Sequence, residues 1–401
     1  MSRLRVAAQA TAKAADGSSD LLPINLVDVL RLYGKIVPMT AVTVTNVDST
    51  RVNTRSASHY FVNAPVDALL IGGASVILYA LFRIRPEMAS SPSVASIAAT
   101  LVWVCNYPHF ASTNYRLYHS RASIAQYPLT SIVTPIVVTA AVIGCYLSPD
   151  AIAPMFIKLY LLWSPYHFSG QTLGITMVYA RRAGFVIDGW LRRCLTAFIF
   201  LTFAVQNAWA EVGRHVNAFY GVNYPTLGVP TWLPETLTKL MWTALAATIA
   251  LLMWKIANGG PRVPLIVLLP AFTQYIWFVA TPAGQFAYTV PLFHSLQYLL
   301  IAWNVQLKQG LDDRHRAPSV RFVWTESTRW MAINIAGGYA LFWALPHLGS
   351  HFGKPLVFST AVMLAAIQVH HFFVDGVIWR LHYPAARSPL SSSLREVSGR
   401  T

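Results

Sequence analysis

The sequence predicts an all-α fold, a polytopic bundle of about ten transmembrane helices, and three observations support it. Of the 401 residues, 55% are hydrophobic and only 11% are charged, whereas soluble domains carry roughly 25% charged residues. The apolar residues occur in runs of the length that a membrane-spanning helix needs, about 20 residues. These runs do not alternate between polar and apolar residues, as the strands of a membrane β-barrel would.

The predicted spans follow from these apolar runs, taken in order along the chain. They cover approximately residues 66–83, 89–110, 128–147, 151–179, 189–208, 237–256, 262–281, 288–307, 329–349 and 356–379. The fourth span contains Pro165 and Gly170. Because proline removes a helical hydrogen bond, we expect a kink or a break there, with neighbouring helices satisfying the freed backbone groups.

Basic residues predict the orientation of these spans, because Lys and Arg gather on the cytoplasmic side of a membrane. If both termini are cytoplasmic, one side of the bundle collects most of them, whereas the opposite loop 282–287 is uncharged. The net charge of +15 is then explained by topology and by anionic lipid headgroups, so no nucleic-acid partner is needed. The basic residues on this side include Arg116, Arg121, Arg181, Arg182, Arg192, Arg193, Lys255, Arg262, Lys308, Arg314, Arg316, Arg321, Arg380, Arg387, Arg395 and Arg400.

Composition divides the chain into three parts. Residues 1–60 are polar and lack the apolar core of a signal peptide, so we expect a cytoplasmic tail; the basic, Ala-rich start also leaves a transit peptide open. Residues 61–382 form the predicted transmembrane domain. Residues 383–401, which include SPLSSSLREVSGRT, are expected to be a disordered tail.

Histidines fall inside four of the predicted spans, each among aromatic and polar neighbours. The stretches are NYPHFASTNYR with His109, SPYHFSGQTLG with His167, LFHSLQYLLIAWN with His294, and QVHHFFVDGVIWR with His370 and His371. Titratable groups at membrane depth are costly, so each one indicates a functional site. The simpler alternative is that each histidine makes an interhelical hydrogen bond.

Helical spacing gives each histidine a polar neighbour, because residues three or four apart share a face. We expect these neighbours to orient the second ring nitrogen, as the outer partners of metal-bound imidazoles do. At this spacing His109 has Thr113, His167 has Gln171, His294 has Gln297 and Tyr298, and His371 has Asp375.

An inward histidine on each of four helices is how bundle cores build metal sites. Imidazole suits iron, copper, zinc and nickel, and the three cysteines form no CxxC pair that would indicate a cluster or a zinc site. We expect His109, His167, His294 and His370 to bind one metal ion, Fe(II) by preference. Copper and haem remain open.

These stretches resemble the Brp/Blh family of bacterial membrane carotene dioxygenases. The order PHF, YHF, FHS and VHHFFVD is similar to the family's PH, HF, HS and PH motifs over roughly residues 100–380. The resemblance implies a helical protein of the bacterial inner membrane that holds non-haem iron through histidines and splits β-carotene with dioxygen. It aligns His109, His167, His294 and His370 with the motif histidines, and Asp375 with an acidic residue after the last motif.

The chain departs from the family pattern at several positions. Thr113 or Asn114 replaces the acidic residue after the first motif, and Gln171 or Thr172 replaces the one after the second. Tyr298 stands where the HS motif has a second histidine four residues on. If the family's metal needs that histidine, this chain must supply another ligand, and either His371 or Tyr298 is available.

The functional prediction is an integral-membrane, metal-dependent oxygenase that acts on a lipid-soluble isoprenoid or acyl substrate. Asp375 would orient His371 or help to bind the metal, and Tyr298, Gln297 and Gln171 would line the side of dioxygen or substrate. The partners implied are membrane lipid, a lipophilic small molecule and dioxygen. Two alternatives stay open: a transporter or channel that uses intramembrane His and Asp, and a non-catalytic haem or metal protein.

Overall fold

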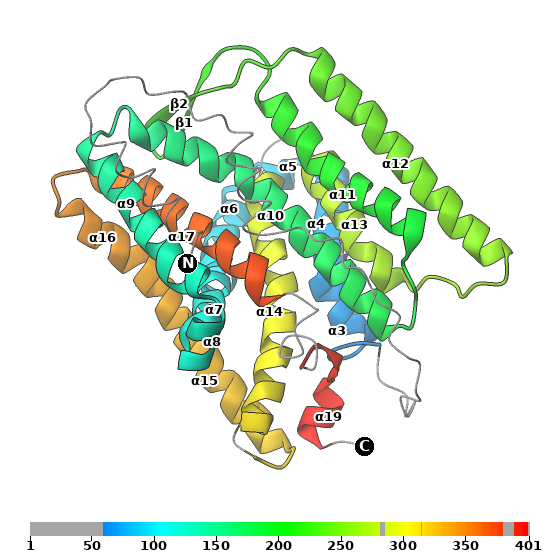
Figure 1. The fold of residues 1–401 in the computed structure, drawn as a ribbon. Helices are drawn as coiled ribbons and strands as arrows, with labels where there is room; N and C mark the ends of the chain where they lie inside the picture. Colours follow the sequence, from blue (N-terminus) through cyan, green and yellow to red (C-terminus); the bar gives the residue numbers. More distant parts are fainter. Residues whose placement is uncertain (1–58, 281–284, 314, 380–388, 400–401) are drawn as a thin grey trace, which may run out of the picture. The chain divides into compact units, whose positions relative to one another are not determined.

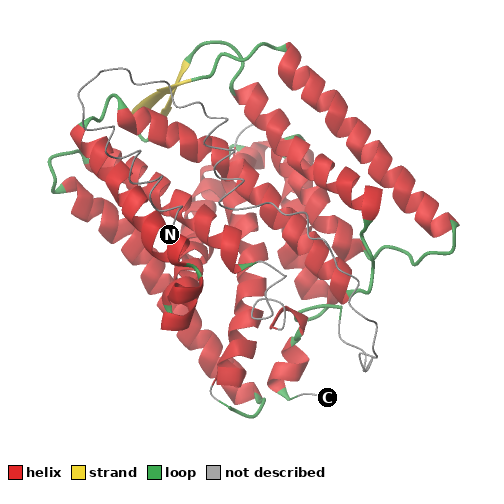
Figure 2. Ribbon diagram, viewed as in Figure 1, coloured by secondary structure: helices red, strands yellow, loops and turns green. Residues whose placement is uncertain are grey.

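The computed structural model describes residues 59–280, 285–313, 315–379 and 389–399 (Figure 1). These residues are mostly helical, with one small two-stranded sheet (Figure 2), so the all-α prediction is confirmed. Most of the predicted N-terminal tail, residues 1–58, lies outside the described residues. The α-helices are α3 Ala64–Ala68, α4 Ala74–Ile84, α5 Pro86–Ala89, α6 Pro92–Leu101, α7 Tyr107–Tyr118, α8 Arg121–Gln126, α9 Thr134–Leu147, α10 Ile152–Arg182, α11 Gly189–Ala210, α12 Trp232–Ala257, α13 Leu265–Phe278, α14 Gln285–Asp313, α15 Val320–Tyr339, α16 Leu345–Ser350, α17 Leu356–Ile378 and α19 Leu394–Ser398.

Four helical segments of the described chain are long and apolar enough to cross a membrane. Each of the ten predicted spans falls on one or more helices, but the expected number of ten spans is not confirmed by length and composition. A further helix, α13, is apolar but shorter. The four candidate spans are Ala64–Ile84, Leu129–Leu147, Trp232–Ala257 and Leu356–Ile378.

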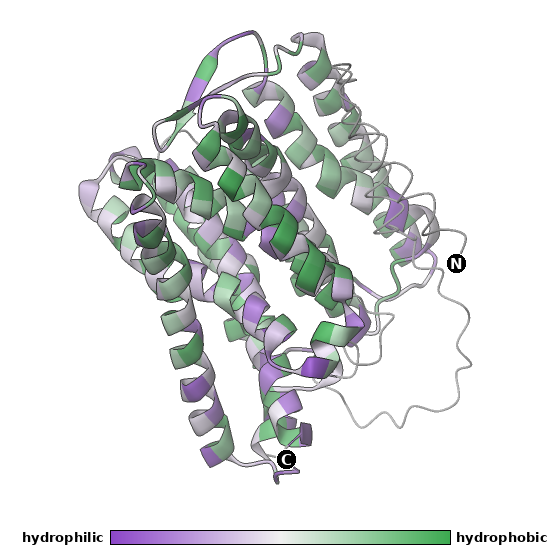
Figure 3. Ribbon diagram, turned by 60° about the vertical axis from the view of Figure 1, so that its left-hand side comes forward, coloured by the Kyte–Doolittle hydropathy of each residue, from purple (hydrophilic) through white to green (hydrophobic). Residues whose placement is uncertain are grey.

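Hydrophobic residues are frequent along the helices (Figure 3), and many large apolar side chains are exposed. Helix α12 is the clearest case, because only 11% of its most apolar window is buried. Its exposed side chains include Leu240, Ile249, Met253 and Trp254. Apolar faces of this extent mark a surface that meets lipid or another protein.

Within the described residues, four π-helical turns precede or interrupt the helices. They are η2 Leu69–Gly73, η3 Val102–Asn106, η4 Leu129–Val133 and η5 Ala340–Ala344. A π-turn adds one residue to a helix, so every side chain after it is rotated relative to those before it, and such turns are common near functional sites. The turn η3 leads directly into α7, and the Ile71 carbonyl in η2 accepts a hydrogen bond of 2.5 Å from Gln297 Nε2.

Helix α10 runs through Pro165 as one continuous helix of 31 residues, so the expected break is absent. The Ser169 hydroxyl donates to the Pro165 carbonyl over 2.9 Å, within the same helix. A single proline costs one backbone hydrogen bond. Helix α10 packs against α11, α13 and α17.

A short hairpin, β1 Val216–Phe219 and β2 Val222–Pro225, lies between α11 and α12. Its two turn residues, Tyr220 and Gly221, have φ values of 46° and 74°. Two successive left-handed residues are typical of the tight turn whose twist matches antiparallel strands. The hairpin packs against α10 through β2.

The C-terminal residues 389–399 were expected to be disordered, but they form the 3₁₀ turn η6 Pro389–Ser391 and helix α19. Leu390 and Val397 are buried, and the Leu394 amide donates to the Phe61 carbonyl over 2.7 Å. The segment is therefore packed onto the helical domain through its apolar side chains. The polar composition of this segment predicted disorder, because its few apolar residues are scattered along it.

The helices that carry the four histidine stretches, α7, α10, α14 and α17, lie near one another (Figure 1). Helix α17 packs against both α7 and α10, and α14 packs against α7. Gln171 links α10 to α14, because its Nε2 donates to the His294 carbonyl on α14 over 2.9 Å. The four histidine stretches identified in the sequence are thus adjacent in space.

Candidate metal centre

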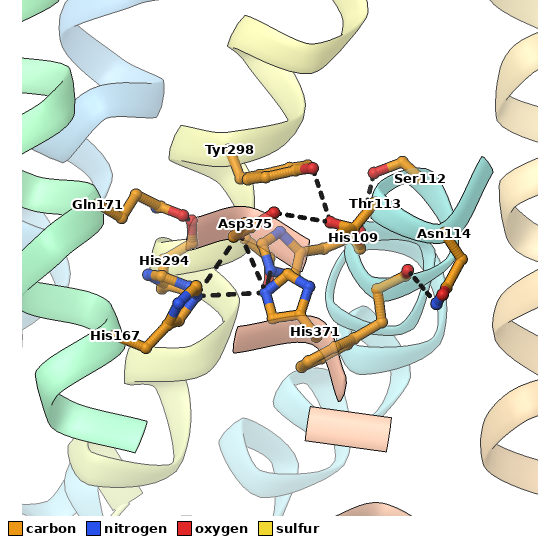
Figure 4. A network of polar contacts seen from close by, with 12 residues as sticks. His109, Ser112, Thr113, Asn114, His167, Gln171, His294, Tyr298, His371 and Asp375 are labelled. Atoms are coloured by element: carbon orange, nitrogen blue, oxygen red, sulfur yellow. Dashed lines mark hydrogen bonds and ion pairs between the residues drawn. The ribbon is translucent and has the colours of Figure 1, made fainter. Parts of the chain in front are cut away.

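Four histidines from four helices meet in the interior of the bundle (Figure 4). They are His109 of α7, His167 of α10, His294 of α14 and His371 of α17, and no more than 9% of any of them is exposed. Each offers one ring nitrogen, and these four nitrogens all lie within 4.8 Å of one another. Among the described residues this is the one group of at least three His, Cys, Asp or Glu side chains that could hold a metal ion.

The closest nitrogens have the spacing of ligands on a single ion. His371 Nε2 lies 2.9 Å from His109 Nε2 and 3.2 Å from His167 Nε2. Two atoms about 2.1 Å from one ion, at roughly 90–110° to each other, are about 3.0–3.4 Å apart. A ring nitrogen carries either one proton or one lone pair, so His371 Nε2 cannot make a full hydrogen bond to both neighbours. A cation would satisfy all three nitrogens at once.

His294 is the outer member of the group. Its ring stacks on Phe168, with centroids 3.8 Å apart and planes 11° from parallel, and its centroid is 5.2 Å from those of His109 and His167. Neither of its ring nitrogens has a hydrogen-bond partner among the described residues, although both are buried. An unpaired buried polar group costs about 1–3 kcal/mol, so these nitrogens fit a ligand role.

The second ring nitrogens are not held by polar neighbours as expected. Nδ1 of His109 and of His371 has no hydrogen-bond partner in the described part of the chain. Their rings are instead fixed by aromatic contacts, with His109 4.1 Å from Tyr298 and His371 4.6 Å from Phe110 between centroids. The polar neighbours Thr113, Gln171 and Gln297 instead contact hydroxyls or backbone carbonyls on other helices.

Asp375 lies on the Nε2 side of these rings. Its Oδ2 is 3.3 Å from His371 Nε2 and 3.7 Å from His167 Nε2, and its side chain is 7% exposed. Its other oxygen, Oδ1, accepts a hydrogen bond from the Thr113 hydroxyl over 3.2 Å. One carboxylate oxygen therefore lies beside two of the three converging nitrogens, those of His371 and His167.

His370 does not belong to this group, which corrects its expected place as the fourth ligand. Its Nε2 lies 3.1 Å from the Tyr118 hydroxyl, and the two rings are nearly parallel with centroids 6.1 Å apart. Consecutive residues on a helix point about 100° apart, so only one of the adjacent pair can face the centre. The structure gives that place to His371.

The two expected glutamines serve the helices around the centre rather than the histidine rings. Gln297 is 1% exposed and donates to Ile71 in η2, away from the rings. Gln171 donates to the His294 carbonyl, while its Oε1 is buried with no hydrogen-bond partner among the described residues. Both side chains tie α14 to its neighbours beside His294.

Tyr298 lies beside His109, and its hydroxyl is 2.6 Å from the Thr113 hydroxyl. Sequence reasoning noted Thr113 only as a neighbour of His109 and as a replacement for an acidic residue. It gave no role to the aromatic residues Phe110 and Phe168, which pack on the rings. Their position directly after His109 and His167 in PHF and YHF was the available signal.

The donor set is suited to a transition metal. Imidazole nitrogens bind iron, copper, zinc and nickel, and one carboxylate oxygen adds a harder donor and a negative charge. The surrounding Phe110, Phe168 and Tyr298 side chains provide an apolar wall. Comparison with known proteins finds no family model, curated protein or solved structure that matches the chain.

Proposed function

We propose that the protein is an integral-membrane oxygenase whose metal ion, Fe(II), is held by His109, His167, His294 and His371. The observation that carries this proposal is the convergence of ring nitrogens from four helices. Among them, His371 Nε2 lies 2.9 Å from His109 Nε2 and 3.2 Å from His167 Nε2. The four candidate spans and their exposed apolar faces support the membrane setting.

The spacing of the nitrogens favours a bare ion over haem. A haem iron takes its axial ligands from opposite faces of the macrocycle, about 4 Å apart at the bond lengths typical of imidazole. The Nε2 atoms of His109 and His371 are only 2.9 Å apart, and His167 Nε2 lies 3.2 Å from the same nitrogen of His371. No room remains between these rings for a porphyrin plane.

A bound ferrous ion with open positions supplies dioxygen activation. The residues of the chain would do the rest. The histidines hold the ion at a fixed place, the aromatic side chains around them exclude water, and Asp375 supplies one negative charge beside them. A dry site inside an apolar bundle suits a substrate that arrives from the lipid phase.

The substrate class proposed is an unsaturated isoprenoid or acyl chain. The resemblance to the Brp/Blh family supports the isoprenoid, although Tyr298 replaces a histidine of the HS motif and the last motif reads VHH instead of PH. In this proposal His371 takes the place expected of His370 in the last motif, and Tyr298 stands where the HS motif has its second histidine.

The test uses the full chain in lipid nanodiscs. Metal content and the absorption spectrum are measured first, and dioxygen uptake is then followed with β-carotene and with an unsaturated fatty acid. About one iron per chain, no Soret band and substrate-dependent uptake support the proposal. A Soret band would indicate a haem protein instead, and metal-free protein would favour a transporter or purely structural histidines.

A further inference from the structure

The Thr113 hydroxyl lies within hydrogen-bond distance of three polar groups, on helices α7, α14 and α17 (Figure 4). Its hydroxyl lies 2.6 Å from the Tyr298 hydroxyl on α14 and 3.2 Å from Asp375 Oδ1 on α17. The carbonyl of His109, one turn earlier on the same helix, is more distant at 3.3 Å. Thr113 is fully buried, and Tyr298 is 3% exposed.

This arrangement differs from the usual behaviour of a helical threonine, whose hydroxyl bonds back to its own helix. Ser112 does so, with its hydroxyl 2.8 Å from the His109 carbonyl, and Thr176 does so on α10, at 2.9 Å from the Thr172 carbonyl. Thr113 has a longer bond of this kind and two shorter ones to other helices. Its hydroxyl is therefore directed toward the neighbouring helices.

The directions of the hydrogen bonds follow from what each group can donate. With a cation in the site Asp375 is a carboxylate, and a carboxylate only accepts. The single Thr113 proton therefore goes to Asp375 Oδ1, and the Tyr298 hydroxyl donates to Thr113 Oγ1. The result is an ordered chain, Tyr298 to Thr113 to Asp375, in which each proton has one place.

The hydrogen bond from Thr113 helps to set the orientation of the Asp375 carboxylate. The terminal torsion of an aspartate is broad, so its carboxylate plane is set by whatever contacts it. Thr113 holds Oδ1, and the other oxygen then faces the ring nitrogens, 3.3 Å from His371 Nε2 and 3.7 Å from His167 Nε2. The separation from His371 Nε2 falls within the range for two ligands on one ion, about 3.0–3.4 Å, and the separation from His167 Nε2 is somewhat longer.

We propose that Asp375 is an oxygen ligand of the metal centre and that Thr113 and Tyr298 are positioning residues that hold it there. The inference rests on the proposed metal centre and adds a specific ligand to it. Four neutral imidazoles alone leave the full charge of a divalent ion in an apolar interior. One carboxylate halves that charge, and its hard oxygen favours Fe(II) over Cu(I).

The test measures Co(II) binding to metal-free, full-length protein in nanodiscs, because the visible spectrum of Co(II) reports its coordination number. Dissociation constants come from competition with a chelator. The variants are Thr113→Val, which keeps the shape and removes the hydroxyl, Thr113→Ser, which restores it, Tyr298→Phe and Asp375→Asn. Thr176→Val is the matched control, because it removes a buried hydroxyl that bonds only to its own helix.

The expected result is graded. Asp375→Asn and Thr113→Val change the Co(II) spectrum in the same direction, and Thr113→Val weakens binding by about 10–100-fold, as the loss of an outer partner of a metal ligand does. Tyr298→Phe gives a smaller loss. Thr113→Ser and Thr176→Val keep the spectrum and affinity of the unaltered protein.

Three results would overturn the inference. If Thr113→Val matches Thr176→Val in spectrum and affinity, Thr113 positions nothing. If Asp375→Asn leaves the Co(II) spectrum unchanged, Asp375 is not a ligand, although the histidine centre stands. If the unaltered protein binds no Co(II), the metal centre itself fails. Tyr298→Phe provides the same comparison should Thr113→Val not fold, and thermal unfolding identifies that case.

Discussion

His109 Nε2 and His371 Nε2 lie 2.9 Å apart, although 262 positions separate these residues in the chain. Neither Nδ1 atom has a hydrogen-bond partner among the described residues, so both rings present their Nε2 atoms to the same point. A contact of this kind between two fully buried imidazoles fits a single N–H···N hydrogen bond or, in the function proposed here, a cation shared with their neighbours. The predictions below follow from that relationship and from the packing that maintains it.

Metal removal is expected to lower thermal stability. An ion that binds only the folded chain stabilises it by about 2.7 kcal/mol when present at 100 times its dissociation constant. Chelation should therefore lower the unfolding temperature of the unaltered protein in nanodiscs, and added Fe(II) should restore it. His371→Ala should show neither shift, because it lacks a central ligand. Equal shifts in both proteins would mean that the chelator acts elsewhere.

The buried ion pair of Lys158 and Glu211 is expected to be essential for stability. Both side chains are less than 10% exposed, and Glu211 Oε2 also accepts from the Leu227 amide over 2.7 Å, which links the segment after β2 to α10. Lys158→Met leaves a buried carboxylate without its cation. Breaking such a pair from one side costs about 3–5 kcal/mol.

The matched control for this prediction is Lys308→Met. Lys308 forms an exposed pair with Asp312 one turn along α14, at 2.6 Å, and such pairs contribute only about 0.3–0.5 kcal/mol. Denaturant unfolding of the two variants gives the comparison. A loss for Lys158→Met as small as that for Lys308→Met would contradict the prediction, and adding Glu211→Gln to Lys158→Met should recover part of the loss.

Arg182 is expected to hold the C-terminal segment 389–399 against the bundle. Its Nη1 donates to the carbonyls of Leu390 and Ser392 over 2.8 and 2.9 Å, and its guanidinium lies 4.2 Å from the Phe61 ring centroid. Hydrogen bonds to charged groups are worth about 1.5–3 kcal/mol. Arg182→Ala should therefore speed hydrogen exchange in 389–399 by roughly tenfold or more.

Arg181→Ala is the control for this exchange measurement, because Arg181 is the preceding residue and is exposed. It should leave the exchange of the C-terminal segment unchanged. If both variants speed exchange equally, the effect comes from charge at the end of α10 rather than from the contacts of Arg182. If neither does, the apolar side chains of the segment suffice to hold it.

Much of the fold follows from the sequence, because long apolar runs with low charge leave few alternatives to helices. The sequence does not determine which face of each helix points into the bundle. His370 and His371 are equally apolar in context, and the choice between them depends on how α17 packs against α7 and α10. The turn η3 adds a residue just before His109, so a regular period carried across it places the side chain wrongly.

The partners of the histidines were predictable only in part. Spacing correctly placed Asp375 beside His371, since both lie on one face of α17. Spacing wrongly predicted that Gln171 and Gln297 contact histidine rings, because both side chains are long enough to reach backbone carbonyls on other helices. Such choices depend on which acceptors neighbouring helices expose, and one helix considered alone does not contain that information.

The most direct test of the central claim is the iron content of two variants that differ by one position. His371→Ala and His370→Ala, purified identically in nanodiscs and loaded with Fe(II) without oxygen, are compared by elemental analysis with the unaltered protein. The account predicts that His370→Ala retains about one iron per chain and that His371→Ala loses it. Equal iron content in the two variants would contradict a metal centre built on His371.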